Sequence, residues 1–205
     1  MILNTFSSLF MTEPKKEPWW KNGWVFGLAL LGMLHLTGTA VHVQAGFQRV
    51  LLYTGLFHPD LVPKADRQAA NLQFRLANED GEVYSLTDFD GEVRFVNFWA
   101  TWCAPCLAEM PAIAKLHADY GDKIHFSVVS MDDDFTTALA YMANQKFGIN
   151  PVTRASAVPR SITSGAIPTT IILDRNGRIA VYEAGMADYN SARFRASLDR
   201  LLEEA

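Results

Sequence analysis

The strongest constraint on this chain is a pair of cysteines, Cys103 and Cys106, with only two residues between them. They are the only cysteines among 205 residues. A mostly apolar run at 92–98, typical of a strand buried on both faces, leads directly into the pair. After it, apolar residues recur at helical spacing from Pro105 to Tyr120, which predicts a helix with one buried face. The pair therefore lies where a predicted strand gives way to a predicted helix.

Three kinds of site use such a pair. A structural zinc site needs four ligands, and His117 and His125 lack the spacing that would complete one, so we expect no metal and no cofactor. A structural disulfide across so short a loop restrains little of the unfolded chain. Both alternatives stay open, but thiol-disulfide exchange is favoured, because there the second thiol must reach the mixed disulfide that the first one forms.

Composition limits the function classes. The net charge of −4 and the pI near 5.7 argue against a nucleic-acid-binding protein, which should be basic. The length and the hydrophobic content allow one domain of roughly 130 to 150 residues with a non-globular extension.

The extension contains a predicted membrane anchor. Residues 24–43 form a stretch without Asp, Glu, Lys or Arg. This stretch is about as long as a helix that crosses a bilayer. Three lysines lie just before this stretch and only Arg49 lies shortly after it. By the positive-inside rule, residues 1–23 are then a cytoplasmic tail and the rest of the chain lies on the extracytoplasmic (periplasmic) side of the inner membrane. A cleavable signal peptide ending near Ala45 is the alternative, but the apolar run is long and starts late for one.

Residues 44–71 read as a juxtamembrane segment and a linker. The second apolar stretch, 46–57, is too short to span a bilayer. It could continue the helix outward, lie on the membrane surface or dock on the domain. Residues 61–71 are polar and predict a linker, so the folded domain is expected at 72–205.

The domain is predicted to combine strands and helices in a fixed order. Strand patterns occur at 72–76, 83–86, 124–131, 169–173 and 179–184 besides the one before the cysteines, and further helices are expected at 132–147 and 194–202. Residues 148–168 read as irregular. The order β-β, β-α-β-α, β-β-α predicts an α/β sheet with helices on both faces.

This pattern, W-C-x-x-C after a buried strand and Ile167-Pro168-Thr169 before the closing hairpin, resembles the thioredoxin superfamily. Within the superfamily the chain is similar to the membrane-anchored TlpA/ResA-type thiol-disulfide oxidoreductases. The resemblance covers 72–205. It implies a thioredoxin-like fold, with a central mixed sheet and an N-terminal hairpin extension, behind a single transmembrane helix.

The two cysteines receive different roles. Cys103 begins the predicted helix, where unpaired backbone N–H groups and the helix dipole stabilise a thiolate, so its pKa should fall from about 8.5 towards 7. We expect Cys103 to be the attacking thiol. Cys106, one turn into the helix, should be more buried and act as the resolving thiol.

Glu109 is a predicted acid-base group. At about 100° per residue it falls on the apolar face of the helix, where burial would raise its pKa and let it exchange a proton with Cys106. The alternative is a glutamate that reaches water at the helix start. In thioredoxins the proton carrier is an aspartate on the preceding strand, where this chain has Asn97. The TlpA/ResA-type pattern similarly has a glutamate three residues after the second cysteine.

The resemblance also implies a substrate-binding edge. It implies a cis bond between Ile167 and Pro168 near the cysteines, which leaves the backbone of Ile167 free to pair with a substrate strand. Trp102 is expected to pack at the rim and to contact substrate.

The direction of exchange follows from the same comparison. Ala104-Pro105 keeps the thioredoxin-like proline and lacks the histidine of oxidising members, which favours a reductase. The implied partners are oxidised proteins, such as cytochrome c apoproteins, and a transmembrane thiol donor of electrons. The alternatives are an oxidase or isomerase on the same fold, and a redox-inert tethered binding domain. A peroxidase is disfavoured because Val96 and Ala100 occupy the positions that its proline and threonine would need.

Overall fold

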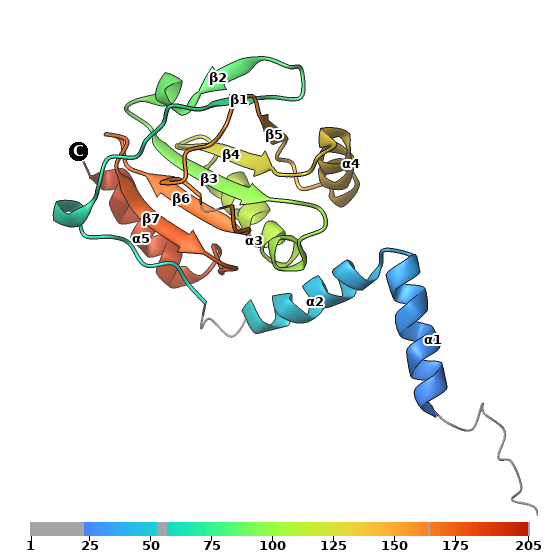
Figure 1. Ribbon diagram of the computed structural model, residues 1–205. Helices are drawn as coiled ribbons and strands as arrows, with labels where there is room; N and C mark the ends of the chain where they lie inside the picture. The colour runs from blue at the N-terminus through green and yellow to red at the C-terminus, as the bar shows by residue number, and fades with distance from the viewer. Residues whose placement is uncertain (1–22, 53–56, 164, 205) are drawn as a thin grey trace, which may run out of the picture. The chain divides into compact units, whose positions relative to one another are not determined.

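The computed structural model describes residues 23–52, 57–163 and 165–204. The chain forms two compact units that divide between Ala40 and Val41. Helix α1 (Gly23–Leu36) belongs to the first unit, and nearly all the other elements belong to the second (Figure 1). The predicted cytoplasmic tail lies almost entirely outside the described residues.

The predicted single helix over 24–43 is interrupted. Helix α1 ends at Leu36 and α2 (Ala40–Leu52) begins after three residues. Gly38 between them has a φ of 68°, a left-handed conformation that glycine adopts at little cost. The Thr37 hydroxyl donates to the carbonyl of Met33 at 2.8 Å and helps to end the helix. No single described helix is long and apolar enough to span a bilayer, although α1 and α2 taken together have the length and the composition of a span. The anchor remains a prediction.

The second unit is built on one mixed sheet of seven strands in the order β2-β1-β5-β4-β3-β6-β7. The strands are β1 (Arg75–Ala77), β2 (Val83–Ser85), β3 (Val93–Trp99), β4 (Ile124–Ser130), β5 (Pro151–Arg154), β6 (Thr169–Leu173) and β7 (Ile179–Ala184). The central strand β3 pairs parallel with β4 and antiparallel with β6. All seven of its residues are buried, which explains its continuous apolar pattern.

Strand β5 was predicted as part of an irregular stretch. It pairs parallel with β4 and antiparallel with β1, and so joins the small N-terminal strand pair to the central sheet. Pro151 is compatible with a strand because it occupies the first position. Only four residues long, β5 depends on its tertiary neighbours, and no local pattern reveals it.

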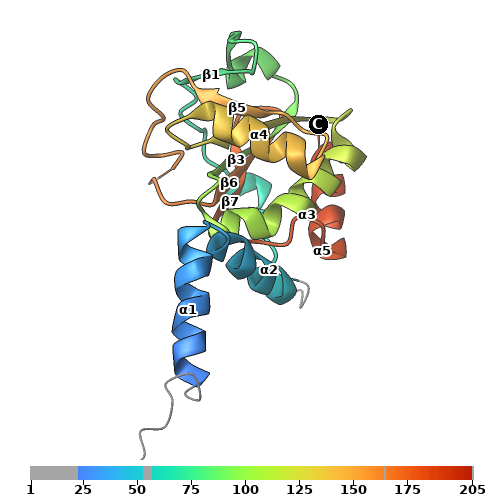
Figure 2. The same cartoon turned by 90° about the vertical axis from the view of Figure 1, so that its right-hand side faces the viewer.

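Helices were predicted on both faces of the sheet, but the α-helices of the described domain cover only one, and the other face has a single short 3-10 helix among the described residues. Helices α3 (Ala104–Tyr120), α4 (Phe135–Gln145) and α5 (Ala192–Glu203) lie on the same face of the sheet (Figure 2). Their buried side chains belong to one hydrophobic cluster. The opposite cluster contains strand residues, Leu86 of the short 3-10 helix η3 (Leu86–Phe89), and irregular segments around Phe74 and Ile162. The reason is that β3-α3-β4 and β4-α4-β5 step along the sheet in the same direction, and right-handed crossovers then place both helices on the same face.

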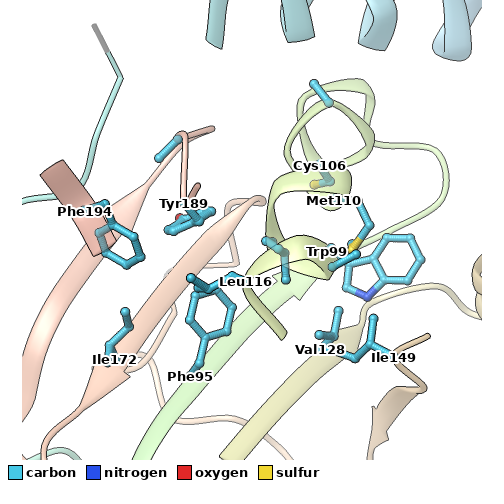
Figure 3. Packing of buried hydrophobic residues seen from close by; sticks show 14 of the residues in the cluster. Phe95, Trp99, Cys106, Met110, Leu116, Val128, Ile149, Ile172, Tyr189 and Phe194 are labelled. Atoms are coloured by element: carbon cyan, nitrogen blue, oxygen red, sulfur yellow. The ribbon is translucent and has the colours of Figure 1, made fainter. Parts of the chain in front are cut away.

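The helix-covered face contains the second cysteine (Figure 3). Cys106 is fully buried in the same cluster as Met110, Leu116, Phe95 and Trp99. A sulfur in this position is shielded from large molecules by close-packed side chains.

The segment predicted as a linker is attached to the domain. The N–H of Val62 donates to the carbonyl of Ala180 at 2.8 Å, and the N–H of Ile179 donates to the carbonyl of Gln68 at 2.8 Å. The buried Arg67 side chain also pairs with Asp174 and with Glu204 near the C-terminus. Residues 62–70 therefore extend the sheet edge beside the start of β7.

Helix α2 docks on α3. Docking on the domain was one of the three possibilities for residues 46–57, of which 53–56 lie outside the described residues. Ala45 and Leu52 are buried in the helix-covered cluster. Proline has no N–H, so Pro111 in α3 leaves the carbonyl of Leu107 without its helical partner. The Arg49 guanidinium donates to that carbonyl at 3.1 Å and so satisfies it.

Candidate active site

The cysteine pair joins the end of β3 to the start of α3. Cys103 is the N-cap residue of α3, and the N–H of Cys106 donates to its sulfur at 3.3 Å. The two sulfurs form a disulfide with a Cα–Cα distance of 5.2 Å. Cys103 is 6% exposed and Cys106 is 0% exposed. Cys103 is therefore the more accessible of the two, and it lies at a helix start, where free N–H groups favour negative charge.

Asp132 holds the loop that presents Cys103, a role that the sequence did not reveal. Its carboxylate accepts hydrogen bonds from the Thr101 N–H at 3.1 Å, the Thr101 hydroxyl at 2.7 Å and the Ser130 hydroxyl at 2.9 Å. We expected residues 132–134 to lie in the first turn of a helix, but α4 starts at Phe135 with Asp134 as its N-cap. The signal that could have indicated the role is the position of Asp132 after a strand parallel and adjacent to β3.

Asp132→Asn is expected to lower the free energy of unfolding by about 1 to 3 kcal/mol, because the amide has one acceptor oxygen fewer for buried donors. Urea denaturation at neutral pH measures the effect. Asp133→Asn is the matched control, since Asp133 is exposed and makes no described hydrogen bond. Equal stability of the two variants would contradict this account of the loop.

Glu109 is buried, and the alternative that it reaches water is wrong. It is 0% exposed. Its Oε1 accepts from the Asn97 amide at 2.9 Å, and its Oε2 accepts from the Ala187 N–H at 3.1 Å. Burial is the main cause that raises the pKa of Glu109 to about 8. The two hydrogen bonds lower this pKa, whereas the charge of Glu183 raises it. Glu109 lies one helical turn after Cys106, so both groups share one face of α3.

Ile167 and Pro168 form an edge beside the same cluster. The bond between them is cis, as the resemblance implied. The carbonyl of Pro168 accepts from the Gly185 N–H at 2.9 Å, whereas the backbone of Ile167 makes no hydrogen bond with any described residue. Ile167 also packs against the cluster that contains both cysteines. Trp102, directly before Cys103, is 64% exposed, which is unusual for so large an apolar side chain.

The predicted site residues fall into two groups. Cys103, Cys106 and Glu109 lie along the first turns of α3, and Ile167 and Pro168 precede β6. Within 23–52, 57–163 and 165–204, no group of three or more His, Cys, Asp or Glu side chains is placed to hold a metal ion. The first turns of α3 bring together two sulfurs and one buried carboxyl group.

Residues 63–198 match the model of the Redoxin family. The chain belongs to this family. Among similar proteins is the thioredoxin-like protein YneN of Bacillus subtilis, 29% identical over 181 residues that cover 86% of this chain and 98% of that protein. The thiol-disulfide oxidoreductase ResA of Bacillus thuringiensis is 30% identical over 141 residues, which cover 67% of this chain and 79% of ResA.

The fold of this Redoxin protein also matches solved structures. A secreted thiol-disulfide isomerase from Corynebacterium glutamicum superposes with a TM-score of 0.54 at 23% identity, covering 71% of this chain and 92% of that one. This match concerns the fold alone. Together with the family match, the ResA relatives and the disulfide at the start of α3, it identifies a TlpA/ResA-type member of the thioredoxin superfamily. The protein is a thiol-disulfide oxidoreductase.

Proposed function

We propose that the protein is a membrane-tethered, extracytoplasmic reductase of protein disulfides, of the kind needed to reduce apoprotein thiols in cytochrome c maturation. The observation that carries the proposal is the pairing of an accessible N-cap sulfur, Cys103, with a buried sulfur and a buried carboxyl on the same helix. This arrangement suits a protein that donates two electrons to a disulfide and is then reduced again.

The reduction takes place in two steps. The Cys103 thiolate attacks one sulfur of the substrate disulfide, forming a mixed disulfide and releasing the other substrate sulfur as a thiolate. Glu109, in its carboxylate form, accepts the proton of the Cys106 thiol. The Cys106 thiolate then attacks Cys103, which closes the enzyme disulfide and releases the second substrate thiolate. Two electrons have passed from the enzyme to the substrate.

Ile167 and Trp102 are the proposed contacts for the substrate chain. The unpaired backbone of Ile167 can add an extended substrate strand by main-chain hydrogen bonds. The exposed ring of Trp102 offers apolar contact area directly beside the attacking sulfur. Neither contact depends on a particular substrate side chain, which suits a reductase that acts on several proteins.

The proposed location rests on the sequence of residues 24–43 and the lysines before it. Outside the cytoplasm, protein disulfides form readily, so a reductase there needs electrons delivered across the bilayer. A transmembrane dithiol protein is the proposed donor. Reduced donor would regenerate the Cys103 and Cys106 thiols after each turnover.

The reduction potential of the cysteine pair tests the direction of exchange. The fraction of reduced protein is measured across glutathione buffers of known ratio, with alkylation to separate the two forms. A reductase should lie near the thioredoxin value of about −270 mV. A value near about −120 mV, as in the strong oxidant DsbA, would contradict the proposal and favour an oxidase.

A further inference from the structure

Next to Glu109, a row of polar residues crosses a face of the sheet that is otherwise apolar. Strand register aligns Asn97 of β3 with Thr170 of β6, and Thr170 with Glu183 of β7. Two residues earlier on β3, the corresponding row is Phe95, Ile172 and Val181, which is entirely apolar. The polar row therefore leads from the partner of Glu109 to the outermost strand of the sheet.

The inner part of the row is buried and incompletely paired. The Asn97 amide donates to Glu109 at 2.9 Å and to the Thr170 hydroxyl at 2.8 Å. The carbonyl oxygen of Asn97 and the hydroxyl of Tyr189 are buried without a hydrogen-bond partner in the described part of the chain. Burial and then the charge of Glu109 raise the pKa of Tyr189, the neighbouring Thr170 hydroxyl lowers it, and the charge of Glu183 raises it, so the Tyr189 hydroxyl lies near Thr170 and both carboxyl groups. Unpaired buried polar groups cost about 1 to 3 kcal/mol each, so packing alone does not explain them.

Glu183 is the outer end of the row. Its side chain is partly exposed and forms no hydrogen bond or ion pair with any described residue. Burial and the nearby charge of Asp60, which is itself paired with Arg193, raise the pKa of Glu183. The backbone hydrogen bonds from residues 62–70 reach β7 only at its first residues, so they do not cover Glu183.

We propose that Glu183 is the group through which the buried Glu109 exchanges its proton with water, by way of the hydroxyls of Thr170 and Tyr189. The inference rests on the proposed role of Glu109. The thiol proton of Cys106 passes to the Glu109 carboxylate and then along the row to Glu183, which releases it to solvent. No electrons move in this transfer. During reduction of the enzyme the proton travels in the opposite direction.

The decisive variant is Glu183→Gln, which removes the proton-carrying group and preserves the size of the side chain. The rate at which Cys106 resolves a mixed disulfide on Cys103 is measured in single turnovers between pH 6 and 9 with a small model disulfide. A slowing of about tenfold is expected, below the roughly 100-fold typical of a direct acid-base group. Small buffer bases such as imidazole should restore the rate, because they can accept the proton in place of Glu183. Glu92→Gln, an exposed charge at the opposite end of β3, is the matched control.

Three results would overturn the proposal: an unchanged rate, a slowed rate that buffer does not restore, or an equal slowing in a Glu109→Gln background. The first two remove Glu183 from proton transfer, and the third shows an effect independent of Glu109. Removing the Glu183 charge should also lower the pKa of Glu109, so the slowing is compared above that pKa, where Glu109 is ionised in both proteins, and the reduction potential of the unaltered protein is measured alongside. If the protein is an oxidase and not a reductase, the reduction potential will show it, and the comparison of resolution rates will still test the role of Glu183.

Discussion

With Cys106 replaced by serine, the protein is expected to lose catalytic turnover and to accumulate as a covalent complex with its substrates through Cys103. The physical reason is that Cys103 is the accessible sulfur at the helix start, whereas Cys106 is fully buried and can reach only its neighbour. Without a resolving thiol, the mixed disulfide cannot close intramolecularly. Non-reducing gel electrophoresis of whole-cell extracts, followed by identification of the captured chains, measures the outcome and names the substrates.

Cys103→Ser is the matched control for that experiment. It keeps one thiol, but the remaining sulfur is buried, so no complexes should form. Equal trapping by both variants would contradict the assignment of roles. If Cys103→Ser retained full function in cells, the redox-inert tether would be favoured over an oxidoreductase mechanism.

Replacing Glu109 with glutamine is expected to slow resolution by Cys106 by about 100-fold at neutral pH, the lower end of the usual range for a general base. In the unaltered protein the rate should rise with pH up to about 8, where the Glu109 carboxyl ionises. The variant should lack that rise. Stopped-flow measurement of disulfide closure across pH gives both results. Unchanged rates in Glu109→Gln, with a retained pH profile, would remove Glu109 from the mechanism.

The same carboxyl links stability to pH. The folded-state pKa of Glu109, about 8, lies above its ordinary value of 4.5, so the folded state binds a proton that the unfolded state has lost. The stabilising contribution is complete below pH 4.5 and disappears as the pH rises to 8. Relative to Glu109→Gln, the unaltered protein should lose up to about 1.4 kcal/mol of stability per pH unit in this window. Urea denaturation of both proteins at several pH values checks the sign.

Much of the site followed from sequence because its chemistry depends on short-range spacing. Two cysteines separated by two residues, at a strand-to-helix change, defined the disulfide and which sulfur caps the helix. Helical periodicity placed Glu109 on the apolar face, and burial there is observed. These inferences need only the geometry of one helix, which local sequence encodes well.

The rest depended on contacts between distant segments. Asp132 binds Thr101 only because β4 lies beside β3, and a run of three aspartates looks the same whether it caps a helix or holds a loop. Strand β5 is too short for a periodic signal, and without it the sequence could not show the crossover that puts α4 on the same face as α3. Likewise, the sequence shows only that Asn97 replaces the proton-carrying aspartate of thioredoxins, whereas in the fold its amide donates a hydrogen bond to Glu109.

The pH dependence of Cys103 alkylation, measured on the reduced protein with iodoacetamide, tests the central claim most directly. A sulfur that caps α3 should titrate well below the free-thiol pKa of about 8.5, towards about 7, and should react before Cys106. Reaction with the pKa and rate of a simple thiol, or equal labelling of both cysteines, would contradict the account.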